Sequence, residues 1–234
     1  MAKTRVAVVT GAGQGMGRSV ALKFAENGID VVLVGRTAKK LESVAEEISA
    51  LGQNATVKAL DVTDGVQVQS LAESLQGTRV DLLVNCAGEA LIKPIEETTE
   101  AEWDLVLTTN LKGPFLMVRA LLPLLRQSDD ASIINIGSKA ALGSFPGITA
   151  YTASKTGLLG FTRSLAAELR EEEIRVVLLC PGPADTPMRW AATPDFDPKL
   201  AIAPETIADS VWWLVSLPKG VTTGEVLLQS IHFE

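Results

Sequence analysis

The sequence predicts a single α/β domain built around a parallel β-sheet. Short apolar runs rich in β-branched residues alternate along the chain with segments in which apolar residues recur at helical spacing. Uninterrupted apolar runs are typical of strands that are buried on both faces, as in parallel sheets. The 234 residues are 47% hydrophobic and show no break in composition, so one domain over residues 1–234 is expected.

The alternation places the strands and helices approximately. Strands are expected at residues 6–9, 31–34, 56–60, 80–84, 132–136, 175–179 and 225–228. Helices are expected at about 18–27, 41–51, 64–75, 100–125, 151–169 and 204–215. The carboxyl ends of parallel strands lie at one edge of the sheet, where open α/β folds bind their ligands. Residues that directly follow strands are therefore the first candidates for a functional site.

Charge and hydropathy exclude several classes of partner. The chain has 21 Lys plus Arg against 28 Asp plus Glu, a net charge of −7, so neither nucleic acid nor an anionic membrane is expected as a partner. No uninterrupted apolar run approaches the ~18 residues that span a bilayer, and no cleavable signal pattern precedes the first strand. We expect a soluble, cytoplasmic protein.

Cysteine and histidine are too sparse for metal or triad chemistry. Cys86 and Cys180 each end an apolar run without CxxC spacing, so packing in the core is expected rather than a redox role. The single histidine, His232, stands near the end of the chain, which argues against a histidine-based metal site and a Ser-His-Asp triad. We expect no metal.

A glycine-rich turn follows the first strand. Gly11, Gly15 and Gly17 form the pattern GxxxGxG, with Gln14 and Met16 between them, and the form GxGxxG is not met. A strand, a glycine turn and a helix can cradle a phosphate, because the amino end of the helix presents free N–H groups and a positive dipole. Glycines in such a turn can also serve tight packing alone.

The end of the second strand carries a cation where a dinucleotide would place its adenosine ribose. A carboxylate there would bind the 2′-hydroxyl, but Gly35 offers none, and Arg36 suits a 2′-phosphate. NADP(H) is thus preferred over NAD(H). The alternative is that Arg36 is one more solvated charge.

Two further strand ends contribute candidates at the same edge. Asp61 and Val62 follow the third strand, and Asn85, Ala87 and Gly88 follow the fourth. Small residues such as Ala87 and Gly88 let a cofactor approach the backbone closely, although a simple turn would look similar.

Asn110 is a polar residue inside the long apolar helix expected at 100–125. It either distorts the helix by competing for backbone hydrogen bonds or satisfies a buried polar partner.

Ser138, Tyr151 and Lys155 bring a hydroxyl, a phenol and an amine into one short segment. In a helix, Tyr151 and Lys155 stand on one face about one turn apart, roughly 6 Å along the axis. A phenol titrates near ~10 in isolation, and a neighbouring ammonium favours its ionised form, so the pair could exchange a proton near neutral pH.

These motifs occur together in one known family. The glycine turn at 10–17, Asn85 to Gly88, Asn110, Ser138, Tyr151-x-x-x-Lys155, and Pro181-Gly182 with Thr186 have the order and approximate spacing of the short-chain dehydrogenase/reductases. The chain resembles this family along essentially its whole length, and most of all its 3-oxoacyl-[acyl-carrier-protein] reductases and related carbonyl reductases. The resemblance implies a Rossmann-like, doubly wound parallel sheet of about seven strands with helices on both faces. It also implies a homo-oligomer, a tetramer or a dimer.

The resemblance implies a role for each matching residue. Tyr151 would protonate the carbonyl oxygen as hydride arrives, and Lys155 would lower the phenol pKa and hold the nicotinamide ribose. Ser138 would orient the carbonyl, and Asn110 would position a water in the proton relay. Thr186 would hold the nicotinamide carboxamide. The full set of expected cofactor contacts is Gly11, Gln14, Gly15, Met16, Gly17, Arg36, Asp61, Val62, Asn85, Ala87, Gly88, Tyr151, Lys155, Pro181, Gly182 and Thr186.

Two positions depart from the family pattern. Cys86 stands where a second asparagine is common, a change that leaves the backbone of this turn in place. The carboxyl end, residues 229–234, lacks the Asp-Gly-Gly ending common among relatives, which affects the subunit interface made by this end.

The substrate is expected to be an apolar carbonyl compound. Residues 183–204 are rich in proline and suggest a lid-like segment. An apolar pocket mouth is expected from Phe145, Pro146, Ile148, Met188 and Trp190. An acidic carrier protein would need a basic surface, whereas residues 129–130 and 171–173 are acidic, so we expect a free ketone or a 3-oxoacyl thioester.

Three other functions are compatible with parts of the sequence. A 3-oxoacyl-[acyl-carrier-protein] reductase of fatty-acid synthesis is the main alternative. A non-catalytic NADP(H)-binding regulator is disfavoured because Ser138, Tyr151 and Lys155 are all present. A hydrolase that uses Ser138 and Lys155 would leave the glycine turn and Tyr151 without a role.

Overall fold

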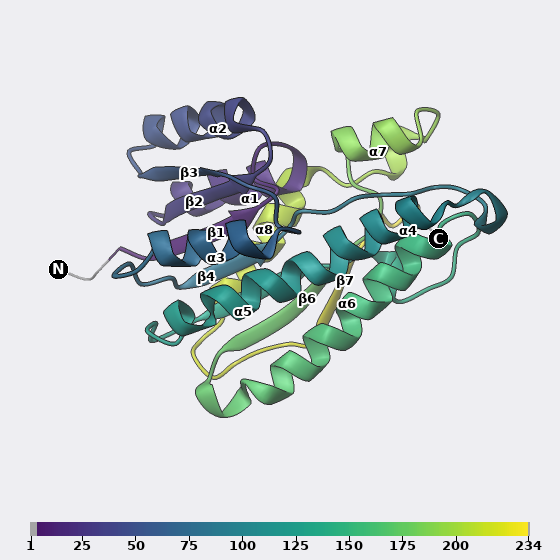
Figure 1. The fold of residues 1–234 in the computed structure, drawn as a ribbon. Coiled ribbons are helices and arrows are strands. Elements are labelled where there is room, and N and C mark those ends of the chain that lie inside the picture. Colours follow the sequence, from purple (N-terminus) through teal and green to yellow (C-terminus); the bar gives the residue numbers. More distant parts are fainter. Residues whose placement is uncertain (1–3, 234) are drawn as a thin grey trace.

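A single parallel sheet with helices on both faces forms the core of the computed structural model, which describes residues 4–233 (Figure 1). All neighbouring strands are parallel, in the order β3-β2-β1-β4-β5-β6-β7. The strands are β1 (Val6–Thr10), β2 (Asp30–Gly35), β3 (Ala55–Ala59), β4 (Leu82–Asn85), β5 (Ser132–Ile136), β6 (Arg175–Pro181) and β7 (Glu225–Leu228). This architecture confirms the doubly wound, seven-stranded fold.

The helices pack in two layers. Their bounds are α1 (Gly15–Glu26), α2 (Ala38–Ala50), α3 (Gly65–Ser74), α4 (Glu100–Leu107), α5 (Gly113–Leu125), α6 (Thr149–Glu168), α7 (Pro187–Ala192) and α8 (Pro204–Val215). Side chains from α1, α2 and α8 share one buried cluster, and those from α3, α5 and α6 share another. Because side chains alternate along a strand, Val9 enters the first cluster and Val8 the second.

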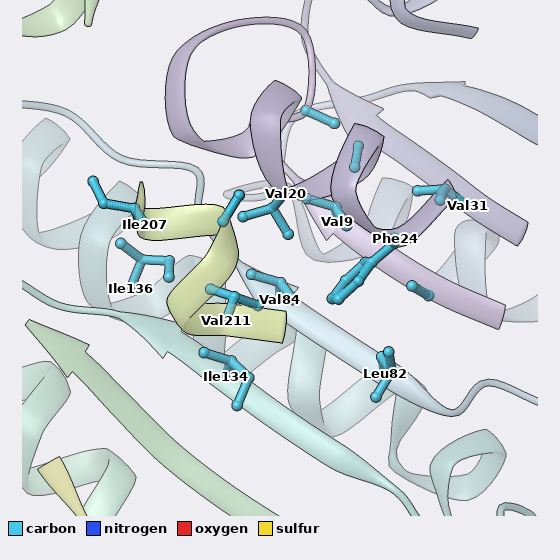
Figure 2. Close-up of a cluster of buried hydrophobic side chains, with 14 of the residues drawn as sticks. Val9, Val20, Phe24, Val31, Leu82, Val84, Ile134, Ile136, Ile207 and Val211 are labelled. Atoms are coloured by element: carbon cyan, nitrogen blue, oxygen red, sulfur yellow. The ribbon is translucent and has the colours of Figure 1, made fainter. Parts of the chain in front are cut away.

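The first cluster anchors the helix that follows the glycine turn. Figure 2 shows Phe24 and Val20 of α1 beside Val9 of β1 and Val211 of α8. Phe24 is fully buried, so truncation to Ala would cost about 3–5 kcal/mol of stability. The cluster therefore fixes the position of the amino end of α1 over the sheet.

The predicted helix at 100–125 is interrupted by a π-helical turn, Thr108–Lys112, between α4 and α5. The run Glu100–Leu125 has the length and hydropathy of a membrane-spanning helix, but half of its apolar window is buried inside the domain. Core helices meet the same criteria, and α5 contributes Met117 and Leu121 to the second buried cluster.

The sheet has a reversal of strand order between β1 and β4, because the chain winds from β1 toward β3 and then returns to add β4. In open α/β sheets, the crevice outside the carboxyl ends of such strands is the usual ligand site. Thr10, at the end of β1, ties the two strands together: its Oγ1 accepts hydrogen bonds of 3.0 Å from the backbone N–H groups of Cys86 and Ala87. The glycine turn and the loop after β4 therefore border one crevice.

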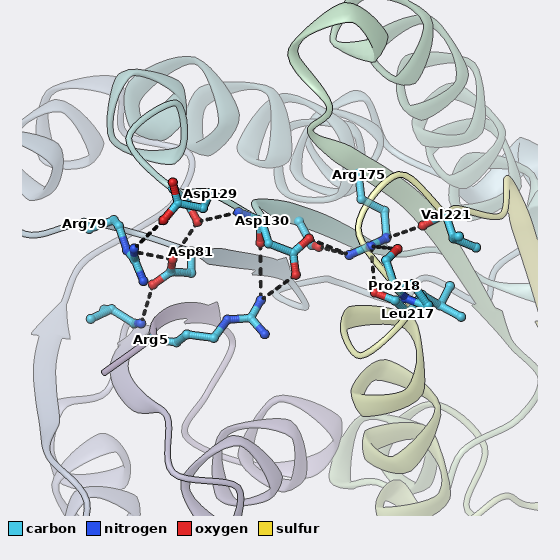
Figure 3. A network of polar contacts seen from close by, with 12 residues as sticks. Arg5, Arg79, Asp81, Asp129, Asp130, Arg175, Leu217, Pro218 and Val221 are labelled. Carbon is cyan, nitrogen blue, oxygen red and sulfur yellow. Dashed lines mark hydrogen bonds and ion pairs between the residues drawn. The ribbon is translucent and has the colours of Figure 1, made fainter. Parts of the chain in front are cut away.

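The opposite, amino edge of the sheet carries a network of paired charges (Figure 3). Arg175 is 5% exposed and donates to Ser132 Oγ (2.7 Å). It also donates to the backbone oxygens of Val221, Leu217 and Pro218. Such a buried guanidinium holds the loop before β7 against β5 and β6, because each carbonyl would otherwise lose its partner.

Asp81 is the second centre of this network. It accepts hydrogen bonds from Val6 N (2.9 Å) and Ser128 Oγ (2.6 Å), and Arg79 Nε lies 2.9 Å from its Oδ1. The starts of β1, β4 and β5 are thereby joined through side chains as well as through the ladder.

Candidate active site

Two cavities adjoin at the carboxyl edge of the sheet. The first, the glycine cavity, is bordered by the glycine turn and by the loops after β2, β3 and β4. The second, the tyrosine cavity, has a volume of about 270 Å³ and is lined by Ser138 and Tyr151 together with the loop after β6. Met16, Thr186 and Met188 line both. A ligand in one cavity therefore lies against a ligand in the other.

The cavities divide the sequence-predicted residues into three groups. The glycine cavity is lined by Gly11, Gln14, Gly15, Met16, Gly17, Arg36, Asp61, Val62, Ala87, Gly88 and Thr186. The tyrosine cavity is lined by Met16, Ser138, Tyr151, Pro181, Gly182 and Thr186. Asn85, Asn110 and Lys155 line neither and lie behind the walls.

The glycine turn has the shape of a cradle for a phosphate. Gly11 has φ +67°, and a Cβ atom on it would lie 3.0 Å from the backbone of Ala87. A Cβ atom on Gly17 would lie 2.3 Å from the carbonyl oxygen of Gly11, which no side chain allows. Helix α1 begins at Gly15 with no side-chain cap at Gln14, so its first N–H groups are available to an anion. The turn thus fits the pyrophosphate of a dinucleotide.

Asn110 fixes the loop that follows β4. It is fully buried, and its Oδ1 accepts from Glu89 N (2.8 Å) while its Nδ2 donates to Glu89 O (2.9 Å) and Ser154 Oγ (3.0 Å). Of the two roles expected for Asn110, satisfying a buried polar partner is the one observed, and the helix is also distorted at this position. The helix is widened here, but the amide bonds to Glu89 and Ser154 rather than to the backbone of its own helix.

Asn85 lies beneath the site. Its side chain is buried, with 3% exposed, and its Nδ2 donates a hydrogen bond to Asn135 Oδ1 at 2.9 Å. Asn135 in turn donates to Thr162 of α6. Its side chain therefore joins β4, β5 and α6 instead of facing the glycine cavity.

Tyr151 and Lys155 lie on one face of α6, as their spacing predicts. The Lys155 ammonium is 5.8 Å from the centre of the phenol ring and donates to the carbonyl oxygen of Ile136 at 2.9 Å. Lys155 is 5% exposed, and no carboxylate among residues 4–233 lies within ion-pair distance of it. A buried cation without a counter-ion stabilises negative charge that forms nearby.

Ser138 stands at the carboxyl end of β5, beside the same cavity. Its Oγ accepts a hydrogen bond from Ala140 N (3.1 Å) and begins a short 3₁₀ turn, Lys139–Ala141. The hydroxyl proton remains available to a ligand, because a hydroxyl both accepts and donates. The tyrosine cavity thus offers two hydroxyl donors to a carbonyl oxygen.

Comparison with known proteins identifies the family. A family model described as short chain dehydrogenase matches residues 5–196. The chain belongs to this family. Among curated relatives, the (2S)-[(R)-hydroxy(phenyl)methyl]succinyl-CoA dehydrogenase subunit BbsD of Thauera aromatica is 34% identical over 236 residues, covering 96% of this chain and 94% of that protein.

Solved structures of short-chain dehydrogenases share the whole fold. An alcohol dehydrogenase of Thermococcus sibiricus, complexed with 5-hydroxy-NADP, has a TM-score of 0.92 at 27% identity and covers 99% of both chains. A 3-ketoacyl-(acyl-carrier-protein) reductase of Brucella melitensis, complexed with NADH, has a TM-score of 0.89 at 28% identity and covers 98% of both chains. The family resemblance is confirmed, and the protein is a dehydrogenase/reductase that uses a nicotinamide cofactor.

This short-chain dehydrogenase has a charge arrangement at the ribose end of the glycine cavity that the sequence did not reveal. Arg36 lines the cavity, but its Nη2 is 2.7 Å from Glu89 Oε1. Lys40, in the first turn of α2, also lines the cavity and donates to Gln14 Oε1 at 2.5 Å. The sequence could have indicated Lys40 as a second cation of this cavity, because it stands four residues after Arg36, at the start of the expected helix.

The tyrosine cavity has walls that sequence reasoning only partly found. Phe145, Pro146, Ile148 and Met188 line it as expected. Trp190 does not: its indole N–H donates to Asp185 at 2.7 Å, so the prediction that it lines the mouth is wrong. The lid-like segment forms α7 and a 3₁₀ turn, Pro198–Leu200, and several of its residues border the cavity.

The wall residues of the tyrosine cavity that the sequence analysis did not name include Lys139, Arg189, Phe196 and Phe233. Phe233 comes from the carboxyl end of the chain, where the sequence offered no motif. Its ring is 6.2 Å from that of Phe196, so the tail and the lid-like segment meet at this wall.

Cys86 borders the glycine cavity, and Cys180 is buried near Ser138. Burial raises the pKa of the Cys86 thiol to about 12 and also raises the pKa of Cys180. Both are free, and the neutral thiol is the dominant form at neutral pH.

Proposed function

We propose that the protein is an NADP(H)-dependent oxidoreductase that interconverts a ketone, or a 3-oxoacyl thioester, and a secondary alcohol. The observation that carries this proposal is the shared wall of the two cavities. Met16, Thr186 and Met188 separate a phosphate cradle from a cavity that contains Tyr151 and Ser138. A dinucleotide seated in the first would present its nicotinamide to a carbonyl in the second.

The residues of the chain supply proton transfer and charge stabilisation. A bound nicotinamide cofactor would supply the hydride. The hydroxyls of Tyr151 and Ser138 would donate to the carbonyl oxygen, where negative charge develops, and Tyr151 would transfer its proton. The Lys155 ammonium, held by Ile136 O, stabilises the phenolate that remains. Asn110 keeps the loop after β4 in place beside Lys155.

The decisive experiment is an activity panel of free ketones and 3-oxoacyl thioesters with NADPH and with NADH. We expect NADPH oxidation with at least one apolar ketone. A panel without turnover, for a protein that still binds NADPH, would contradict the proposal. A non-catalytic regulator would bind NADPH and give the same output when Tyr151 is replaced by Phe, whereas an enzyme would lose its turnover.

The cofactor preference rests on the two cations of the glycine cavity, Arg36 and Lys40, and on the absence of a carboxylate at Gly35. Glu89 binds Arg36 and would have to yield it to a 2′-phosphate. The ratio of kcat/KM for NADPH and NADH tests this. Arg36→Ala and Lys40→Ala should each lower the ratio, and a wild-type preference for NADH would overturn it.

A 3-oxoacyl-[acyl-carrier-protein] reductase remains the second candidate, favoured by the 28% identity to the reductase of Brucella melitensis. The part of the electrostatic objection that rests on Asp129 and Asp130 is weakened by their position. Asp129 and Asp130 pair with Arg79, Arg5 and Arg175 at the amino edge, away from the tyrosine cavity. Comparing kcat/KM for one 3-oxoacyl group on coenzyme A and on a carrier protein separates the candidates.

We also propose a homo-oligomer. An open apolar groove lies between α4, the π turn, α5 and α6, and is lined by Leu107, Leu111, Phe115 and Phe161. Phe115 is 42% exposed although it packs edge-on against Phe161. Burial of this groove by a second copy would remove apolar surface from water. Light scattering should show a dimer or tetramer, and Phe115→Asp should shift it toward monomer.

A further inference from the structure

One wall of the tyrosine cavity is a continuous strip of aromatic rings and cations. The Lys139 ammonium is 5.9 Å from the ring centre of Phe145 and 4.6 Å from that of Phe233. Phe233 packs beside Phe196, and the Arg189 guanidinium is 5.0 Å from the ring centre of Phe196. All five residues line the cavity. The strip therefore faces whatever the cavity holds.

The positive charge of this strip is not balanced by the described part of the chain. Among residues 4–233, no Asp or Glu lines the tyrosine cavity, and neither Lys139 nor Arg189 forms an ion pair. Other arginines of the chain do find carboxylates, as Arg126 does with Glu172. Within the described residues, the guanidinium of Arg189 has one hydrogen bond, a long one of 3.3 Å to Thr193 Oγ1.

Arg189 is also half-buried and close to the reacting groups. Burial lowers the pKa of its guanidinium, and the negative charge of an ionised Tyr151 opposes that change. Lys139 directly follows Ser138 in the chain. The two cations thus line the same cavity as the two hydroxyls that would bind a carbonyl oxygen.

We propose that the tyrosine cavity binds ketones that carry a carboxylate, with Arg189 and Lys139 as the anion-binding pair and the three phenylalanines around the apolar body of the substrate. The proposal rests on the reductase function proposed above and specifies its substrate class. A planar guanidinium matches a carboxylate with two parallel hydrogen bonds, and an ammonium adds a point charge. The aromatic rings lie against both cations and displace part of the water around them, which strengthens their attraction for an anion.

The alternative is that Lys139 and Arg189 have a packing role only, in which each is held by its aromatic neighbours and by solvent. Cation–π contacts at exposed sites contribute about 0.5–1 kcal/mol, enough to orient a side chain without any ligand. The two hypotheses differ in the effect of a carboxylate on the substrate. If the cations serve only packing, then a substrate with a carboxylate binds no more tightly than its neutral ester.

The test uses pairs of substrates that differ only in charge. Phenyl ketones with a carboxylate two or three bonds from the carbonyl, such as 4-oxo-4-phenylbutanoate, are compared with their methyl esters at saturating cofactor. We expect kcat/KM for the best acid to exceed that for its ester about tenfold or more, mainly through KM. Raising the ionic strength should reduce this preference, because salt screens the attraction.

Arg189→Gln and Lys139→Gln should each lower the acid-to-ester ratio about tenfold. Lys199→Gln removes a cation of the lid-like segment that does not line the cavity, and it should leave the ratio unchanged. Binding of 4-phenylbutanoate, which has no carbonyl to reduce, to the cofactor complex should weaken in the same two variants. Equal turnover of acid and ester, or an unchanged ratio in both variants, would overturn the carboxylate proposal while leaving the reductase intact. Failure of the reductase itself would appear as no turnover of any ketone, ester or acid.

Discussion

Arg175 at the amino edge of the sheet and Lys155 near the carboxyl edge are both 5% exposed cations, yet their surroundings differ in kind. Arg175 has four hydrogen-bond acceptors and Asp130 at 3.6 Å, all within the chain. Lys155 has one carbonyl partner and a phenol ring. Polar groups at the amino edge satisfy one another and hold strands together. Those at the carboxyl edge retain unused hydrogen-bonding capacity, which is what a ligand requires.

The largest expected effect is on turnover, at the carboxyl edge. If the two edges divide activity and stability in this way, Tyr151→Phe should lower kcat by roughly 10³-fold, because the proton donor is removed. NADPH affinity, measured by cofactor fluorescence, should change less than about threefold, and the urea midpoint should stay near that of the parent. Tyr151 is the single tyrosine of the chain, so no other phenol can replace it. Full activity of this variant would remove Tyr151 from the mechanism.

The converse change lies at the amino edge. Arg175→Met should lower the free energy of unfolding by roughly 3 kcal/mol, since three backbone carbonyls and Ser132 lose a charged donor. Urea denaturation measures it, and Arg170→Met, at an exposed position, is the matched control with little effect. Activity per folded molecule should persist. A variant that is stable but inactive would show that the two edges are not separable.

Asn110 combines both behaviours, because it is a carboxyl-edge residue whose amide is fully bonded. Asn110→Ala leaves the N–H and C=O of Glu89 without their partners and should cost about 1–3 kcal/mol of stability. Activity should fall as well, because the loop beside Lys155 loses its anchor. Asn110→Asp keeps the acceptor for Glu89 N but places a second buried oxygen opposite Glu89 O, so it should not restore the lost stability. Loss of activity in both variants with unchanged stability would assign Asn110 a purely chemical role.

The smallest expected effect is on the stability of the fold at acid pH, through Glu102 of α4. Glu102 accepts from Thr99 and Lys93, which lower its pKa to about 2. A carboxyl whose pKa is lowered on folding stabilises the fold above its unfolded value of about 4.5, and this contribution is lost as the pH falls toward about 2. Glu102→Gln should flatten the dependence of the thermal midpoint on pH in that window. An identical dependence in parent and variant would mean that the capping interaction is not formed in solution.

Much of the framework follows from local sequence. The runs at 132–136 and 225–228 agree with β5 and β7 at both ends, and the others differ by about two residues or fewer. The pairing of Tyr151 with Lys155 follows from helix periodicity alone. The glycine turn follows from its place between a strand and a helix. In each case the deciding interaction lies within a few residues in the chain.

What sequence reasoning missed depends on contacts between distant residues. The π turn accompanies the bonds of Asn110 to Glu89, 21 positions away. Phe233 reaches the tyrosine cavity only because β7 ends at the carboxyl edge. The position of Asp129 and Asp130, however, could have been predicted from the sequence. They precede the expected strand at 132–136, and the start of a parallel strand lies at the amino edge of the sheet. The electrostatic argument used their charge and did not use this position.

Phe233 has a practical consequence for handling the protein. It lines the tyrosine cavity, whereas Arg5, just before β1, lies among the paired charges of the opposite edge (Figure 3). A carboxyl-terminal purification tag would begin within two residues of the wall residue Phe233, and we expect it to alter the measured KM. A tag ahead of β1 would be joined to the strand that begins at the amino edge, opposite the tyrosine cavity. Assays of substrate preference should therefore use amino-terminal tags, with a carboxyl-terminal fusion as a direct probe of how closely the tail borders the bound substrate.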